Sequence, residues 1–356
     1  MTAAERLIEL LQLKENEAVA VHNPSNMFYL TEGYTGEGVV YISAASRTII
    51  TDFRYTEQAE RQAPGFTVMM TDPDKDHNAL LKACCKADGV NDLRCEECFL
   101  TVEAYGAMKA ALEDITLRDL AKAPEKLREI KTPREIELMR KACEITSETF
   151  RLLLPKIHEG MTETDLRIEL DFLQLKLGAE GNSFDTIMAF GENGSLCHAI
   201  PGPRKLKRGD LVLMDFGCKY GGYCSDMTRT VAFGEPDPEM RKVYGIVQRV
   251  QQECREMVAP GKVCKDIHLH AIHTIDEAGY PGRMGHGLGH SVGIDIHENP
   301  RYSFKCEDLT QPGMVITVEP GIYLPGKGGV RIEDTVLVTE DGWESLTTAP
   351  RDLIIL

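Results

Sequence analysis

The first part of the chain alternates short apolar runs with amphipathic segments. The apolar runs are rich in β-branched residues and are bounded by turn residues, which is typical of strands. Between them, apolar residues recur every three or four positions, as in helices that bury one face. The alternation predicts a small α/β domain. The expected strands are 18–22, 38–43 and 48–52, and the expected helices lie near 3–13, 55–62, 77–87 and 103–113.

The pattern changes after residue 125, where a charged stretch leads into a strong helix signal. Thr132 is followed by Pro133 and, three positions after Thr132, by Glu135, which is the arrangement of a capping box with proline at the first helical position. A long helix is expected from there to about residue 155. We therefore expect two domains, 1–125 and 126–356. Further helices are expected at 162–179, 237–258 and 263–278.

A first pair of apolar strands is expected at 211–217 and 225–233, on either side of a Lys-Tyr-Gly-Gly-Tyr turn. The pair carries Asp215 and Asp226, which can lie on one face of an antiparallel hairpin. Two unpaired carboxylates there would raise each other's pKa, and a cation between them would remove the repulsion. The alternative is a pair of solvated aspartates near a turn.

A second pair is expected at 314–323 and 328–339, and it also carries two carboxylates, Glu319 and Glu333. Glu319 is flanked by apolar residues, and buried carboxylates are rare unless they are paired or bind a metal. The alternative is an ion pair between Glu319 and Arg331.

A glycine-rich segment carries three histidines, His286, His290 and His297. Glycine lets the backbone turn sharply and approach a site closely, so this segment is expected to be functional. His198 lies in a polar stretch before a Pro-Gly turn and, taken alone, is an ordinary loop histidine. Four carboxylates and one imidazole, brought together by the fold, can hold two divalent cations; the five expected ligands are Asp215, Asp226, His290, Glu319 and Glu333.

Composition narrows the possible partners. The 356 residues include 42% hydrophobic and 27% charged residues with a net charge of −16, which is typical of a globular protein and unsuited to nucleic-acid binding. No apolar run is long enough to span a membrane, and the amphipathic, acidic N-terminus does not resemble a signal peptide. The eleven cysteines show no framework spacing. We therefore expect free thiols and a cytoplasmic protein.

These motifs together resemble the metallopeptidase family of aminopeptidase P, prolidase and methionine aminopeptidase. The segment 286–298 resembles the signature of aminopeptidase P and prolidase, and the sequences MDFG…SDMTRT, VEPG and RIED follow in the family's order. The segment 51–59 extends a weaker resemblance into the first domain. The resemblance implies an α+β protein, with a C-terminal pita-bread (creatinase/aminopeptidase-like) catalytic domain and a smaller N-terminal α/β creatinase-like domain.

The resemblance implies a role for each metal ligand. Asp215 is expected to chelate one ion, and Asp226 and Glu333 to bridge two ions. His290 and Glu319 would complete the coordination of the second ion. The oxygen-rich set favours Mn²⁺, with Co²⁺ or Zn²⁺ as alternatives.

The resemblance also implies roles in catalysis. Glu319 is expected to shuttle the proton, and His297 to help stabilise the oxyanion. His286 is expected to line the site, and His198 to approach the bond that is cleaved.

Four residues are expected to bind the substrate, a peptide with proline in second position. Phe184 and Ile187 resemble apolar residues that face a proline ring, with core packing as the alternative. Arg301 matches a position where prolidases bind a carboxylate, although an ordinary loop arginine is the alternative. Arg331 is the fourth expected substrate-binding residue.

The resulting expectation is an Xaa-Pro aminopeptidase that acts as a homodimer, with Xaa-Pro dipeptidase (prolidase) as the closest alternative. A metal-free binding protein or a creatinase on the same fold is an alternative of another class, which the presence of all five ligands disfavours.

Overall fold

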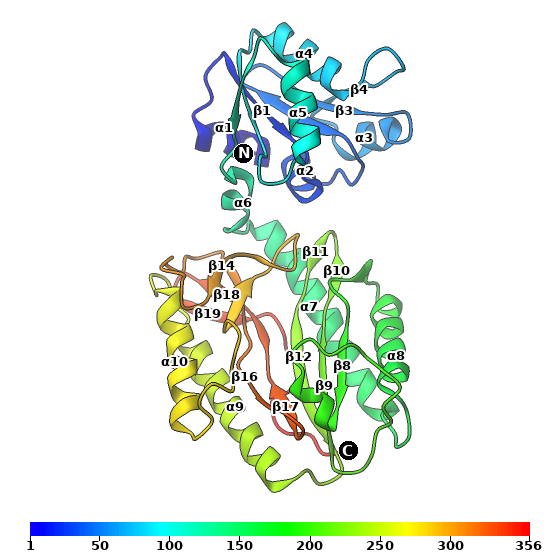
Figure 1. Cartoon of the computed structure of the whole chain (residues 1–356), viewed down its shortest axis with the longest axis vertical. Helices are drawn as coiled ribbons and strands as arrows, with labels where there is room; N and C mark the ends of the chain where they lie inside the picture. Colours follow the sequence, from blue (N-terminus) through cyan, green and yellow to red (C-terminus); the bar gives the residue numbers. More distant parts are fainter. The chain divides into compact units, whose positions relative to one another are not determined.

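The computed structural model describes residues 1–356 and divides into two compact units, Met1–Arg128 and Glu129–Leu356 (Figure 1). The sequence placed the boundary after residue 125, and the compact units separate after residue 128. Each unit has its own hydrophobic core.

The first unit is built on a six-stranded mixed sheet in the order β4-β3-β2-β1-β5-β6. β1 pairs antiparallel with β2 and parallel with β5, so the sheet combines a hairpin with crossover connections. The expected strands and helices are all present, whereas α2, α6 and β4 to β6 had not been predicted. The strands are β1 (Glu17–Val21), β2 (Val39–Ser43), β3 (Arg47–Thr51), β4 (Thr67–Met70), β5 (Asp92–Cys95) and β6 (Thr116–Asp119); the helices are α1 (Ala3–Leu11), α2 (Pro24–Thr31), α3 (Thr56–Gln62), α4 (His77–Asp88), α5 (Val102–Ala111) and α6 (Ala123–Arg128).

The second unit has four long helices that form two pairs. The capping box expected at Thr132 is present, since its hydroxyl accepts from the Glu135 N–H and the Glu135 carboxylate accepts from the Thr132 N–H. A second capping box starts the next helix at Thr162. In Figure 1 the strands of this unit lie between the two helix pairs. The pairs are α7 (Pro133–Leu153) with α8 (Glu163–Lys176), and α9 (Pro238–Glu256) with α10 (Cys264–Glu277).

The strands between these helices form four small sheets, in the orders β12-β9-β8, β11-β10-β7, β14-β13-β15-β18-β19 and β16-β17. Nearly every residue of β9, β12 and β15 is buried, and most of their residues are apolar. The strands are β7 (Gly181–Asn182), β8 (Ile187–Phe190), β9 (Asp210–Phe216), β10 (Cys218–Tyr220), β11 (Tyr223–Cys224), β12 (Met227–Phe233), β13 (Gly289–Ser291), β14 (Glu298–Tyr302), β15 (Val315–Val318), β16 (Gly321–Leu324), β17 (Gly328–Arg331), β18 (Asp334–Thr339) and β19 (Gly342–Ser345).

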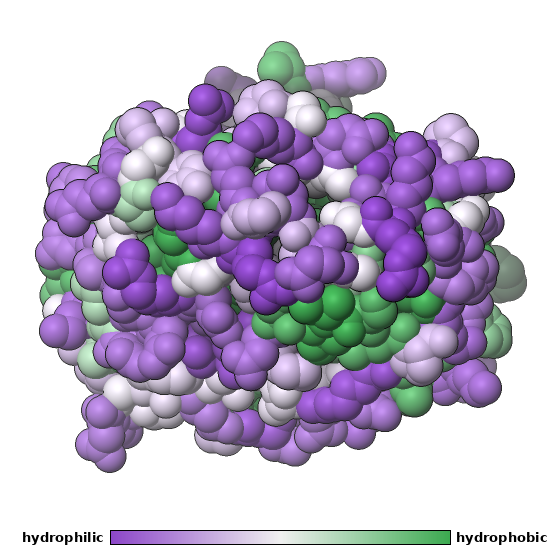
Figure 2. All heavy atoms as spheres, turned by 90° about the horizontal axis from the view of Figure 1, so that it is seen from below, coloured by the Kyte–Doolittle hydropathy of each residue, from purple (hydrophilic) through white to green (hydrophobic).

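The surface is largely polar, as the charge composition predicts. The face shown in Figure 2 is mostly hydrophilic, with a broad apolar area right of the centre. None of the helices combines the length and the apolar character that a membrane span requires.

Candidate metal centre

The first two carboxylates lie on one face of the β9–β12 hairpin. Asp215 pairs with Thr228 in the antiparallel register, and Asp226 immediately precedes β12. Asp226 is therefore two residues from the direct partner of Asp215, which is the diagonal position on the same face. Both side chains are buried.

The second two carboxylates lie where a strand ladder is interrupted. The sequence predicted one continuous hairpin, but the structure has two ladders, β15 with β18 and β16 with β17. Val318 pairs with Asp334 and Gly321 with Arg331, so the register on both sides of the break places Glu319 opposite Glu333. The break follows from Pro320, which has no N–H to donate to a ladder.

Backbone and side-chain bonds join the two carboxylate pairs. The Glu333 N–H donates to the Thr228 carbonyl over 3.1 Å. The Thr335 hydroxyl donates to the Asp226 carbonyl over 2.7 Å. The Thr228 hydroxyl donates to Glu333 Oε2 over 2.6 Å. Segments more than 100 residues apart in the chain are thus fixed beside each other.

His290 completes the cluster from β13. Its Nδ1 lies 3.1 Å from the Ser291 carbonyl, which can only accept, so Nδ1 carries the proton and Nε2 has a free lone pair. Nε2 lies 3.5 Å from Asp226 Oδ2 and 3.6 Å from Glu319 Oε1. One ligand atom each from Asp226, His290 and Glu333 lie within 4.8 Å of one another. The hydrogen bond at Nδ1 selects the tautomer that a metal ligand needs.

The electrostatics of this cluster are unfavourable without a cation. Burial and the charge of Glu333 raise the pKa of both Asp226 and Glu319 well above their usual range. Burial and the charge of Asp215 raise the pKa of Glu333 to about 8. Burial lowers the pKa of His290 to about 3, so its imidazole is neutral. The folded chain thus assembles groups that cannot all carry their charges unaided.

The orphaned oxygens of the cluster fit a divalent cation. Asp215 Oδ1, Asp226 Oδ1 and Glu333 Oε1 are buried and accept no hydrogen bond. Unpaired buried carboxylate oxygens are costly, and a divalent cation with oxygen and imidazole ligands would satisfy them.

Arg331 forms an ion pair with Asp215 and not with Glu319. Its Nη2 lies 2.5 Å from Asp215 Oδ2, and its Nη1 donates to the Tyr323 hydroxyl over 2.8 Å. Its Nε donates to the Thr228 hydroxyl over 3.0 Å. Arg331 therefore borders the site while most of its donors are occupied by protein groups.

The three other histidines that the sequence nominated, His198, His286 and His297, differ in their surroundings. His286 Nδ1 lies 2.7 Å from the Gly287 carbonyl, and its Nε2 lies 2.9 Å from the Tyr323 hydroxyl. Burial lowers the pKa of His286 to about 4, which fits a neutral ring with both nitrogens occupied. His297 packs edge-on against His290, with ring centroids 4.4 Å apart. Both His297 and His198 are exposed, so they remain available to a ligand.

One cavity of about 1010 Å³ collects all twelve side chains that the sequence nominated. Phe184 and Ile187 form part of its apolar wall, and Arg301 lies on β14 opposite His290. The twelve are Phe184, Ile187, His198, Asp215, Asp226, His286, His290, His297, Arg301, Glu319, Arg331 and Glu333.

The residues that the sequence did not nominate include three polar ones that line the cavity or bind its charged groups. Arg167 of α8 also lines the cavity, but its charge fits an ordinary solvated helix face. Tyr323 links Arg331 to His286, and Thr228 binds both Glu333 and Arg331. Of these three, only Thr228 could have been predicted from the sequence, because it lies two residues after Asp226 and therefore on the same strand face.

The comparisons with known proteins agree with this architecture. Residues 137–340 match the model of metallopeptidase family M24, and residues 4–130 match the creatinase/prolidase N-terminal domain. The Xaa-Pro dipeptidase of Pyrococcus furiosus is 34% identical over 351 residues, which cover 98% of this chain and 99% of that protein.

Two solved structures are similar over nearly their whole length, and each alignment covers 99% of both chains. An Xaa-Pro dipeptidase from Bacillus anthracis has a TM-score of 0.95 at 37% identity. An X-Pro aminopeptidase from Thermotoga maritima has a TM-score of 0.92 at 33% identity. With its creatinase-like first unit and its pita-bread second unit around a cluster of carboxylates, the chain belongs to metallopeptidase family M24.

Proposed function

We propose that the protein hydrolyses the Xaa-Pro bond of dipeptides. The observation that carries the proposal is that one cavity holds both the carboxylate–imidazole cluster and the cation Arg301. A dipeptidase must bind the C-terminal carboxylate close to the reacting bond, and an arginine can do so through two parallel hydrogen bonds. The similarity to Xaa-Pro dipeptidases supports the same choice.

The cluster is proposed to hold two divalent ions, most suitably Mn²⁺ because its ligands are hard oxygens and one imidazole. The ions would be held by the five expected ligands, Asp215, Asp226, His290, Glu319 and Glu333. Bound cations would supply Lewis acidity, which polarises a carbonyl and lowers the pKa of water.

The chain's own groups would handle the proton and the substrate. Glu319 has a raised pKa and reaches the cavity, so we assign it the transfer of a proton to the leaving nitrogen. His297 and His198 are assigned to hydrogen bonds with the substrate, because both are exposed in the cavity. His286, whose ring nitrogens are both occupied, is assigned to positioning.

The leaving nitrogen of proline is a tertiary amide without an N–H, and its ring is apolar. Phe184 and Ile187 are proposed to contact this ring, since both lie in the cavity wall. Selectivity for proline would then come from shape and apolar contact.

The test compares Gly-Pro with Gly-Pro-Ala and with Gly-Pro amide in the presence of Mn²⁺. We expect kcat/KM to be at least about 10-fold higher for the dipeptide, because one charge-assisted pair contributes about 1.5–3 kcal/mol. Arg301→Gln should raise KM for Gly-Pro and leave KM for the amide unchanged. Equal turnover of the tripeptide would overturn the dipeptidase assignment.

Xaa-Pro aminopeptidase is the second candidate, and the similarity to the Thermotoga maritima structure favours it. Comparable turnover of Gly-Pro-Ala and Gly-Pro would establish this alternative.

We also propose a homodimer in the cytoplasm. The homodimer rests on the family resemblance, and the location on the eleven free cysteines, which suit a reducing compartment. Light scattering on the purified protein tests the first, and fractionation of cells tests the second.

A further inference from the structure

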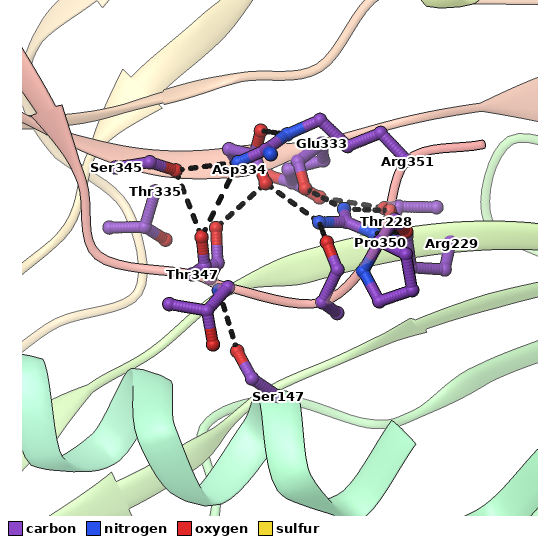
Figure 3. Close-up of polar contacts among 12 residues, drawn as sticks. Ser147, Thr228, Arg229, Glu333, Asp334, Thr335, Ser345, Thr347, Pro350 and Arg351 are labelled. Carbon is purple, nitrogen blue, oxygen red and sulfur yellow. Dashed lines mark hydrogen bonds and ion pairs between the residues drawn. The ribbon is translucent and has the colours of Figure 1, made fainter. Parts of the chain in front are cut away.

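Arg229 lies next to Thr228 on β12, outside the cavity lining, and all of its N–H groups are hydrogen-bonded. Arg229 is only 1% exposed and is not among the residues that line the cavity. Figure 3 shows its polar contacts. A guanidinium has five N–H donors in a fixed plane, and here each one has an acceptor. Nε donates to the Pro350 carbonyl (2.9 Å), Nη1 to the carbonyls of Thr228 (2.9 Å) and Glu333, and Nη2 to Asp334 Oδ1 (2.8 Å) and the Ala349 carbonyl (2.8 Å).

Two of these acceptors determine where the Glu333 carboxylate lies. The Glu333 carbonyl accepts from Arg229, and its N–H donates to the Thr228 carbonyl. The same Nη1 binds the Thr228 carbonyl, so one nitrogen joins β12 to the Glu333 backbone. The side chain of Glu333 is thus attached to a peptide unit that is fixed on both sides.

Asp334 holds the guanidinium in this orientation. Its carboxylate is fully buried and accepts from Arg229, from Gln251 Nε2 (2.8 Å) and from the Thr347 hydroxyl (2.8 Å), in addition to Arg351. A carboxylate with this many donors has a single favourable position. Asp334 also follows Glu333 directly in the chain. The residue that orients Arg229 and the expected metal ligand are therefore neighbours on one backbone segment.

We propose that Arg229 is a positioning residue for the metal centre, which fixes Glu333 through its main chain while Asp334 orients the guanidinium. The proposal rests on the proposed function, because it assumes that Glu333 holds a metal. Groups that orient metal ligands affect metal affinity nearly as strongly as the ligands themselves.

Arg351 provides a matched control, since it binds the same carboxylate without touching a ligand residue. Its Nε binds Asp334 Oδ2, and its Nη2 donates to the Ser345 hydroxyl over 2.9 Å. Lysine keeps the charge in either position but lacks the planar set of five donors. A purely structural role of the Asp334 cluster would lower the stability of both lysine variants, more strongly for the buried Arg229, without a selective loss of Mn²⁺ affinity.

The experiment measures Mn²⁺ affinity by calorimetry for the wild-type chain and for Glu333→Gln, Arg229→Lys and Arg351→Lys. We expect Arg229→Lys to weaken Mn²⁺ binding about 10- to 100-fold, and Arg351→Lys to change it less than about threefold. The visible absorption of the Co²⁺-loaded protein should change in Arg229→Lys alone. Equal Mn²⁺ affinities of the two lysine variants would overturn the proposal.

The controls separate this proposal from the function itself. If the wild-type chain binds no Mn²⁺, or if Glu333→Gln binds it equally well, the proposed metal centre is wrong. If both controls behave as expected and Arg229→Lys still binds like Arg351→Lys, only the positioning role is wrong.

A compensated variant covers the case in which Arg229→Lys does not fold. Arg229→Met combined with Asp334→Asn removes both charges of the buried pair together, while Arg351 and Arg255, which also contact Asp334, lose a countercharge but are partly exposed to solvent. Weakened Mn²⁺ binding by this folded double variant supports the proposal, and wild-type affinity contradicts it.

Discussion

Arg331 and Asp215 form a buried ion pair in the wall of the cavity, with Nη2 2.5 Å from Oδ2. The pair gives Asp215 a countercharge within the chain, while Asp226 and Glu333 have no arginine partner of this kind. Breaking a buried pair by removing one partner leaves a charge that is neither solvated nor compensated.

Arg331→Gln should therefore destabilise the metal-free protein by about 3 kcal/mol or more, measured by urea unfolding in the presence of a chelator. Added Mn²⁺ should recover part of the loss. Arg140→Gln is the control, because its pair with Glu344 is partly exposed and should contribute less than about 1 kcal/mol. Equal losses in the two variants would contradict the importance of the buried pair.

Tyr323→Phe tests the hydrogen-bonded chain from Arg331 to His286. The phenol accepts from Arg331 and donates to His286, so its loss leaves His286 Nε2 without a partner and leaves Arg331 Nη1 with only the Cys197 carbonyl, 3.4 Å away. We expect kcat/KM to fall about 10- to 100-fold, which corresponds to about 1–3 kcal/mol. Mn²⁺ affinity should stay within about threefold of the wild type. An unchanged kcat/KM would show that this chain does not position His286.

The metal-free protein should lose stability as the pH rises from about 6.5 to 8, above the range in which His22, His286 and His290, whose pKa values are lowered on folding, contribute a slope of the opposite sign. The folded state raises the pKa of Glu333 from 4.5 to about 8, so it binds more protons than the unfolded chain in this window. More protons on the folded state means that the free energy of unfolding decreases with pH, by up to about 1.4 kcal/mol per pH unit for one proton.

Thermal unfolding in chelator at several pH values measures this slope. Glu333→Gln should make the slope shallower, and saturating Mn²⁺ should abolish it, because the bound ion favours the charged carboxylates. A stability that rises with pH over this range in the chelated wild-type protein would disprove the prediction.

Gly289→Ala tests the close approach of β13 to β15. A Cβ at this position would lie 1.9 Å from the Thr317 carbonyl oxygen, so the strand that carries His290 would have to move. We expect a loss of about 2–3 kcal/mol in stability and at least a 10-fold loss of kcat/KM. Gly285→Ala is the matched control, since its Cβ would meet no atom within 4 Å. Wild-type activity of Gly289→Ala would show that the close contact between Gly289 and Thr317 does not control the position of His290.

Asp226→Asn tests the central ligand. The amide is similar in shape but lacks the charge, so we expect Mn²⁺ binding and peptidase activity to be lost. The fold should survive, because the replacement removes one of several repelling carboxylates. Circular dichroism and calorimetry measure the two outcomes, and full activity of the variant would refute the role of Asp226 as a ligand.

Much of the fold follows from local patterns in the sequence. The capping box at Thr132 depends on residues three positions apart, and it is present where the sequence predicts it. The family was also recognisable, because short motifs carry its chemical groups. The break of the ladder at Glu319 and Pro320 was not predicted, although the missing N–H of Pro320 was a local signal for it.

The sequence by itself determined which side chains are available for chemistry, since carboxylates in apolar segments and histidines among glycines stand out without coordinates. Only the tertiary structure decided their partners: Arg331 with Asp215 rather than Glu319, Tyr323 with His286, and Arg229 with the Glu333 backbone. Two of these contacts join residues more than 100 positions apart. Such contacts depend on how strands are placed in space, which no short window of sequence contains.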